Sequence, residues 1–244
     1  MSYRTYRGIA DQERILNPEE IDQVIKFNVL PTLAGGTLIF CLTMFATYAL
    51  PYDFGWYILS IVAYIGLAVA TFGFGFRRMN TAALISFHGL SVASGFLQRP
   101  VLLFASQYLG SFEYASQLFI VAVLAATAVI LTITWMVRTF PSFFSPGRGY
   151  MRIATWIAIF GLLGVSVWSL AAIFVGGFDV FLLVSSIITV FMVGIFTIID
   201  IHVLRARVAI GQWVYATASL AINYFILIVR IFLILVIGGG RRRY

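Results

Sequence analysis

Residues 208–229 read VAIGQWVYATASLAINYFILIV and contain no charged side chain. A helix needs about 20 predominantly apolar residues to cross the ~30 Å hydrocarbon core of a bilayer. Other charge-free stretches of comparable length occupy 27–52, 54–76, 79–98, 114–137, 153–178 and 180–199. This pattern predicts an all-α integral membrane protein that forms a bundle of seven transmembrane helices.

The composition excludes several other classes of protein. Hydrophobic residues make up 61% of the 244 residues, charged residues only 10%, and the mean hydropathy is +1.00. A soluble domain is about 45–50% apolar and about 25% charged. A soluble enzyme, a disordered chain and a fibrous protein are therefore excluded. Because Cys41 is the only cysteine, an internal disulfide and a cysteine-based metal cluster are excluded as well.

Polar segments flank a single predicted membrane domain at 27–237. Residues 1–26 form a polar N-terminal segment, in which Asn17-Pro18-Glu19-Glu20 is typical of a helix start. We expect a short interfacial helix there. Residues 238–244 form a basic C-terminal tail. The stretch 100–112 begins at a proline and is too short to span, so it is either an interfacial loop or an extension of the preceding helix.

Basic residues orient the predicted helices. If the segments alternate across the membrane, eleven basic residues gather on the side of the N-terminus and four on the opposite side. Basic loops stay on the cytoplasmic side of a membrane. The N-terminus should therefore face the cytoplasm or the matrix of an organelle. The eleven are Arg4, Arg7, Arg14, Lys26, Arg77, Arg78, Arg138, Arg148, Arg152, Arg205 and Arg207. The tail belongs to the other side only if the last segment crosses fully.

Asp200 is the main acidic residue expected inside the membrane domain. It follows the sixth apolar stretch, and apolar residues continue beyond it to Leu204. A charged side chain in a membrane helix costs about 2.5–3.5 kcal/mol on insertion scales, so it calls for an explanation. One interpretation is a cation ligand or titratable gate. The other is a structural ion pair, for which the candidate cations are Arg205, Arg77 and Arg78.

Three further polar residues are candidates for an ion path or gate. His202 lies two positions after Asp200 and could tune its charge near neutral pH. Asn223 lies ten residues after Trp213, near the expected midplane, where an amide either bridges two helices or lines a path. Arg230 falls inside the last segment and either snorkels to the interface or lines a cavity.

Motifs of enzymes and of cofactor binding are missing from the sequence. No P-loop, G-x-G-x-x-G or H-E-x-x-H pattern occurs. The only lysine, Lys26, precedes the first span, which excludes a retinal protein, and Asp200 is alone at depth, which excludes an aspartyl intramembrane protease. We therefore expect no enzyme, no catalytic residues, no resident metal, no cofactor and no nucleic-acid partner.

Residues 217–232, TASLAINYFILIVRIF, resemble the last-helix signature of the Bax-inhibitor family, which reads roughly L-Y-L-D-I-I-N-L-F-L-Y-L-L-R-I-L. Ile198-Ile199-Asp200 resembles the end of that family's sixth helix, where its members carry an aspartate. Shorter resemblances follow in the same order as in the family, at 86–95, 125–128 and 144–149. In the last helix, the matching positions are Asn223, Phe225, Arg230 and Ile231.

The resemblance implies a fold and an activity. The fold is a seven-helix bundle with the last helix at its centre, and the activity is a pH-sensitive calcium leak. In that family the sixth-helix aspartate pairs with a second aspartate on the last helix, and an arginine at the end of helix two latches onto the pair. Asp200 matches the first acid and Arg77 or Arg78 the latch, whereas the second acid is replaced by Leu220.

The absence of the second acid leaves two hypotheses for the function of the protein. Two close carboxylates share a proton, whereas a single aspartate beside an arginine should stay ionised, and calcium prefers six to eight oxygen ligands. One hypothesis is a passive cation leak with a degenerate, single-aspartate gate. The other is a structural or accessory subunit of a larger membrane assembly. Under either, the lipid bilayer is a partner, and the membrane is a bacterial or archaeal plasma membrane or the mitochondrial inner membrane.

Overall fold

The computed structural model describes residues 16–50, 54–144, 149–175 and 178–240, and it gives the backbone alone for 162–163, 165–175, 178–179 and 240. All regular structure in these ranges is helical. The elements are α2 (Pro18–Val24), the π-helical turn η1 (Ile25–Val29), α3 (Leu30–Ala46), α4 (Phe54–Phe76), α5 (Asn80–Leu109), α6 (Phe112–Thr139), α7 (Gly149–Val175), α8 (Phe178–Ala209) and α9 (Trp213–Gly240).

Five helical segments are long and apolar enough to cross a membrane: Pro18–Ala46, Phe54–Phe76, Phe112–Thr139, Val180–Ala209 and Trp213–Gly239. Their outward sides carry large apolar residues, for example Val69, Leu124 and Phe191. An all-helical chain satisfies its backbone hydrogen bonds within each segment, as a bilayer requires. The helices therefore indicate an integral, multi-pass membrane protein, as the composition predicted.

The first helix begins where the sequence predicted. Asn17 Oδ1 accepts from the Glu20 amide at 2.9 Å, while Glu20 Oε2 accepts from the Asn17 amide at 2.9 Å. This reciprocal pair is a capping box, and Pro18 fills the first helical position. The helix that starts here continues through η1 into α3, so the N-terminal helix and the first apolar segment form one uninterrupted rod.

Helices α5, α8 and α9 extend well beyond the ends of the charge-free stretches that predicted them. α5 continues through Pro100 to Leu109, so the short stretch after residue 99 is a helix extension rather than a loop. α8 runs on to Ala209 and α9 passes Arg230 to reach Gly240. One to three charged residues do not end a helix whose other residues continue its packing, so the limits of the charge-free stretches lie short of the helix ends.

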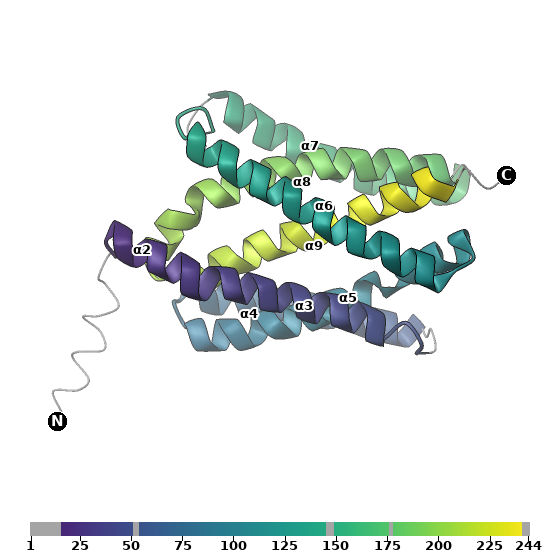
Figure 1. Ribbon diagram of the computed structural model, residues 1–244, viewed down its shortest axis with the longest axis horizontal. Helices are drawn as coiled ribbons and strands as arrows, with labels where there is room; N and C mark the ends of the chain where they lie inside the picture. Colours follow the sequence, from purple (N-terminus) through teal and green to yellow (C-terminus); the bar gives the residue numbers. More distant parts are fainter. Residues whose placement is uncertain (1–15, 51–53, 145–148, 176–177, 241–244) are drawn as a thin grey trace.

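α9 has more of its length inside the protein than the other candidate spans. It contacts α3, α4, α5, α6 and α8. Figure 1 shows it running between α3, α4 and α5 on one side and α6, α7 and α8 on the other. Aromatic pairs join it to two neighbours: Phe225 stacks on Phe40 at 4.5 Å, and Phe232 meets Phe119 edge-on at 5.4 Å between ring centroids.

α9 runs from one end of the structure to the other. It begins at the end of the molecule that carries α2 and finishes at the opposite end (Figure 1). The last segment therefore runs the full length of the structure and does not turn back. Arg241, Arg242 and Arg243 of the tail lie outside the described residues.

α3 and α5 approach closely at Gly95. A Cβ atom added there would lie 2.7 Å from the Phe40 carbonyl oxygen and 2.8 Å from Thr43 Cβ. The first of these neighbours is backbone, which cannot rotate away. Close approach at small residues is a common basis of helix packing in membranes.

We predict that Gly95→Ala lowers the free energy of unfolding by about 1–3 kcal/mol, because the two helices must separate to admit the methyl group. The matched control is Gly66→Ala on α4, where a Cβ atom would have no neighbour within 4 Å. That variant should leave stability unchanged or raise it slightly, since alanine favours helix. Thermal unfolding in detergent measures both, and equal midpoints for the two variants would contradict the packing argument.

Candidate functional site

Asp200 lies well inside α8. The helix continues for nine residues beyond it to Ala209, which at 1.5 Å per residue places Asp200 about 14 Å from the helix end. Its side chain is half-buried and faces α9. The carboxylate is therefore deeper than the end of the charge-free stretch indicated.

Two neutral donors on α9 hold one oxygen of this carboxylate. Asp200 Oδ2 accepts from Ser219 Oγ at 2.9 Å and from Asn223 Nδ2 at 2.7 Å. Ser219 and Asn223 are four residues apart and so share one face of α9. We call these three residues the Asp200 cluster. The cluster joins α8 to α9 through side chains, and Asn223 bridges helices as one of the two sequence interpretations predicted.

The other oxygen of the Asp200 carboxylate, Oδ1, differs from Oδ2 in its hydrogen bonding. Within the described ranges, Asp200 Oδ1 accepts no hydrogen bond, and no arginine, lysine or histidine nitrogen lies within 4.0 Å of the carboxylate. The carboxylate thus has a fixed orientation, with one oxygen engaged and one oxygen available.

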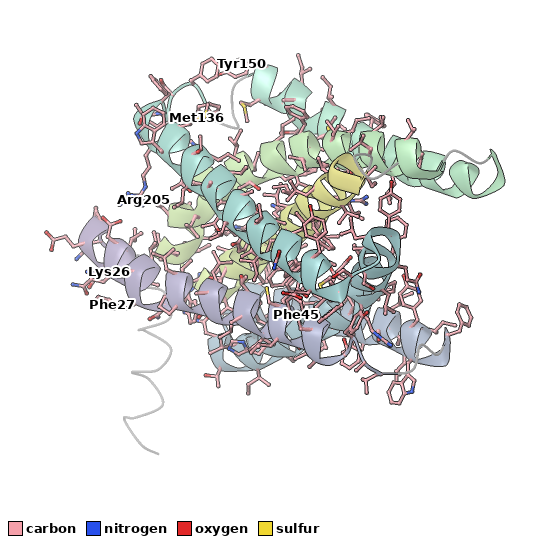
Figure 2. All side chains as sticks on the ribbon, turned by 45° about the vertical axis from the view of Figure 1, so that its right-hand side comes forward. Lys26, Phe27, Phe45, Met136, Tyr150 and Arg205 are labelled. Carbon is pink, nitrogen blue, oxygen red and sulfur yellow. The ribbon has the colours of Figure 1, made fainter. Side chains whose placement is uncertain are left out.

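The ion pair between Asp200 and Arg205, one of the alternatives that the sequence left open, does not form in the structure. Arg205 Nη2 instead pairs with Asp22 Oδ1 of α2 at 2.8 Å, and both side chains are more than half exposed. Five residues along a helix turn through about 500°, which places Arg205 about 140° around α8 from Asp200. In Figure 2, Arg205 lies at the same end of the molecule as Lys26.

Arg77 and Arg78 do not latch onto Asp200 in this structure. Both lie in the turn between α4 and α5, where Arg77 is exposed and Arg78 has a left-handed backbone with φ 61°. Arg78 lies beside the turn between α8 and α9, since a Cβ atom built on Gly211 would be 3.8 Å from its Cδ. The two arginines therefore belong to the turn between α4 and α5, and neither forms an ion pair with the Asp200 carboxylate.

The other candidate residues are separated from the carboxylate. His202 is two residues after Asp200, which turns its side chain about 200° around α8. Arg230 is half-buried two helical turns after Asn223 on the same face of α9, and within the described ranges it has no ion pair. Leu220, at the position of the missing second acid, is buried with 6% of its surface exposed. The structure brings together Asp200 and Asn223 but not His202 or Arg230.

Hydrogen bonds attach the turn between α8 and α9 to neighbouring helices. Gln212 is buried, donates from Nε2 to the Phe76 carbonyl at 2.8 Å, and accepts from Arg207 Nη1 at 2.7 Å. Asn80 Nδ2 donates to the Gly211 carbonyl at 3.2 Å. The turn is thereby attached to the end of α4 and the start of α5.

The N-terminal helix supports α8 from another side. The Leu16 amide donates to the Ala209 carbonyl at 3.1 Å, which satisfies one of the open carbonyls at the end of α8. Ile21, Ile25 and Val208 pack in one buried apolar cluster. α2 and the turn together fix the segment of α8 that leads away from Asp200.

Sequence analysis missed Ser219 as a partner of the carboxylate. The signal was its position four residues before Asn223, which puts a hydroxyl and an amide on one face of an otherwise apolar helix. Within the part of the chain that the structure describes, no three His, Cys, Asp or Glu side chains gather as a metal site. Comparisons with protein-family models, with curated proteins and with solved structures found no match to this chain.

We predict that Asn223→Ala lowers the free energy of unfolding by about 1–2 kcal/mol, because it removes one of two donors from a half-buried carboxylate. In an Asp200→Ala background the same substitution should cost less, since the acceptor is already gone. Denaturant titration in detergent of the two single variants and the double variant measures this coupling. Thr132→Ala, which removes an exposed hydroxyl bonded only to its own helix, is the control. A coupling energy of zero would contradict the hydrogen bond.

Proposed function

We propose that the chain forms a seven-helix transmembrane bundle with α9 at its centre, similar to the Bax-inhibitor family. Support comes from the contacts of α9 with five other helices and from its burial. α5 and α7 would complete the count. α5 is less apolar than the other helices because it carries buried polar side chains, among them Ser91, Ser94 and Arg99. The arginine distribution favours an N-terminus on the cytoplasmic or matrix side.

We further propose that this bundle passes cations and that Asp200 is the residue they meet. The carrying observation is the available Oδ1 of a carboxylate inside a membrane helix, with its other oxygen fixed by Ser219 and Asn223. A structural acid would be matched by a cation or neutralised by a proton, because an uncompensated charge inside a membrane helix is costly. Neutral donors orient the carboxylate without pairing its charge, so that the ionised form can attract a passing ion.

A single carboxylate favours passage over retention of the ion. Calcium takes six to eight oxygen ligands, and Asp200 supplies one carboxylate beside a hydroxyl and an amide. Water would have to supply the remaining ligands. Weak binding of this kind suits a leak, since an ion that binds tightly does not leave.

We predict that the purified chain in liposomes gives calcium-dye flux above empty liposomes, and that Asp200→Asn lowers the rate about tenfold. Asparagine keeps the size of the side chain and an acceptor for Ser219, while it removes the charge that attracts the ion. Glu113→Gln at the exposed start of α6 removes an acid elsewhere and should leave the flux unchanged.

Two results would contradict this proposal. Absence of flux from folded protein would exclude the leak. Flux that is equal in wild type and Asp200→Asn would show that ions take a path that does not include the carboxylate.

We propose as the second candidate a non-transporting accessory subunit of a larger membrane assembly. It is favoured by Leu220, which is buried and apolar at the position that corresponds, by the sequence resemblance, to the second acid of the Bax-inhibitor family. In this case the Asp200 cluster is only a connection between α8 and α9. Stoichiometric partner subunits that copurify from native membranes, together with absent flux, would favour this function over the leak.

A further inference from the structure

The connection between α6 and α7 carries several exposed aromatic side chains. Trp135 belongs to the end of α6, Phe140 and Phe143 to the turn after it, and Tyr150 and Trp156 to the start of α7. Each is at least 41% exposed. Phe143 and Tyr150 contact each other with ring centroids 5.1 Å apart. Figure 2 shows Tyr150 and Met136 at this end of the molecule. Aromatic residues of this kind concentrate at the boundary between membrane and water.

A small buried core holds this region in place. Val137, Phe144 and Met151 pack together, and isoleucines of α8 pack against them. Ile199 and Ile201 among these flank Asp200 in the sequence. The end of α6 and the start of α7 are therefore fixed to each other and to α8.

Two arginines accompany the aromatic side chains. Arg138 and Arg152 directly follow the packed residues Val137 and Met151, so their backbones lie at the same end of the same core. Both side chains are exposed, and within the described ranges neither has a carboxylate partner. Residues 136–156 contain no aspartate or glutamate. The result is a local excess of positive charge beside aromatic rings.

We propose that this surface binds the headgroup phosphate of an anionic phospholipid. A guanidinium group presents paired N–H donors that match phosphate oxygens, and two such groups favour a lipid with net negative charge. Basic pockets between membrane helices on the cytoplasmic or matrix side bind anionic headgroups in this way. The binding surface consists of Arg138, Arg152, Phe143 and Tyr150.

A lipid fits this surface better than a soluble phosphate compound does. Trp156 and Phe160 follow Arg152 by four and eight residues, on a similar face of α7, and are 55% and 64% exposed. They offer an apolar surface for the acyl chains along the helix from Arg152. A soluble anion would leave that surface uncovered. The proposal concerns binding only and does not depend on ion transport by the Asp200 cluster.

Native mass spectrometry of the full chain in detergent tests the proposal, with phosphatidylglycerol and phosphatidylcholine added at equal concentration. We expect wild type to retain phosphatidylglycerol in preference to phosphatidylcholine. Arg138→Gln/Arg152→Gln should retain at least about tenfold less phosphatidylglycerol, with phosphatidylcholine unchanged. The matched control, Lys26→Gln/Arg77→Gln, removes two exposed cations at the same end of the molecule and should bind as wild type does.

Three outcomes would overturn the proposal. They are equal retention by wild type and the arginine variant, an equal loss in the control variant, and an absence of preference between the two lipids in wild type. Inorganic phosphate added as a competitor should not displace the lipid; displacement at equal concentration would assign the surface to soluble anions instead. If the double variant is not monodisperse on size exclusion, Arg138→Lys/Arg152→Lys replaces it. That variant keeps the charge and loses the paired donors, so it should show reduced retention.

Discussion

The packing of α9 against five other helices is the constraint on which the rest of the structure depends. Lipid is as apolar as a leucine side chain, so helices in a membrane associate through close contact and not through exclusion from water. α9 offers small residues for this purpose, and Ala218 and Ala221 are fully buried. Gly75 of α4 lies so close to Tyr215 that an added Cβ atom would be 3.1 Å from its backbone nitrogen.

Hydrogen bonds between side chains define the rotation of α9 about its own axis relative to α8 and α6. The Asp200 cluster aligns α9 with α8, and the hydrogen bond between Tyr224 and Thr127 aligns it with α6. Most other buried hydroxyls, such as those of Ser94 and Thr189, bond to their own helix and impose no such alignment. The few bonds between helices therefore decide which face of α9 meets which neighbour, and they place the carboxylate between two helices.

Contacts at the end of the molecule that carries α2 hold the segment of α8 that follows Asp200. α2 holds the end of α8 through Asp22 and Arg205, while Gln212 attaches the turn after α8 to α4. Ile199 and Ile201 of α8, which flank Asp200 in the sequence, pack against the small core of Val137, Phe144 and Met151 near the proposed lipid surface.

Sequence alone determined the helical class, the position of α4 and the capped start at Asn17, because bilayer thickness and cap chemistry act over a few neighbouring residues. It placed the ends of α5 and α9 too early, because a charge such as Arg99 is accommodated by a distant group, here the Leu50 carbonyl. The partners of Asp200 were decided by tertiary structure alone. Proximity along the chain made Arg205 one candidate, whereas the rotation along α8 directs Arg205 to α2, and Ser219 and Asn223 of α9 bind the carboxylate.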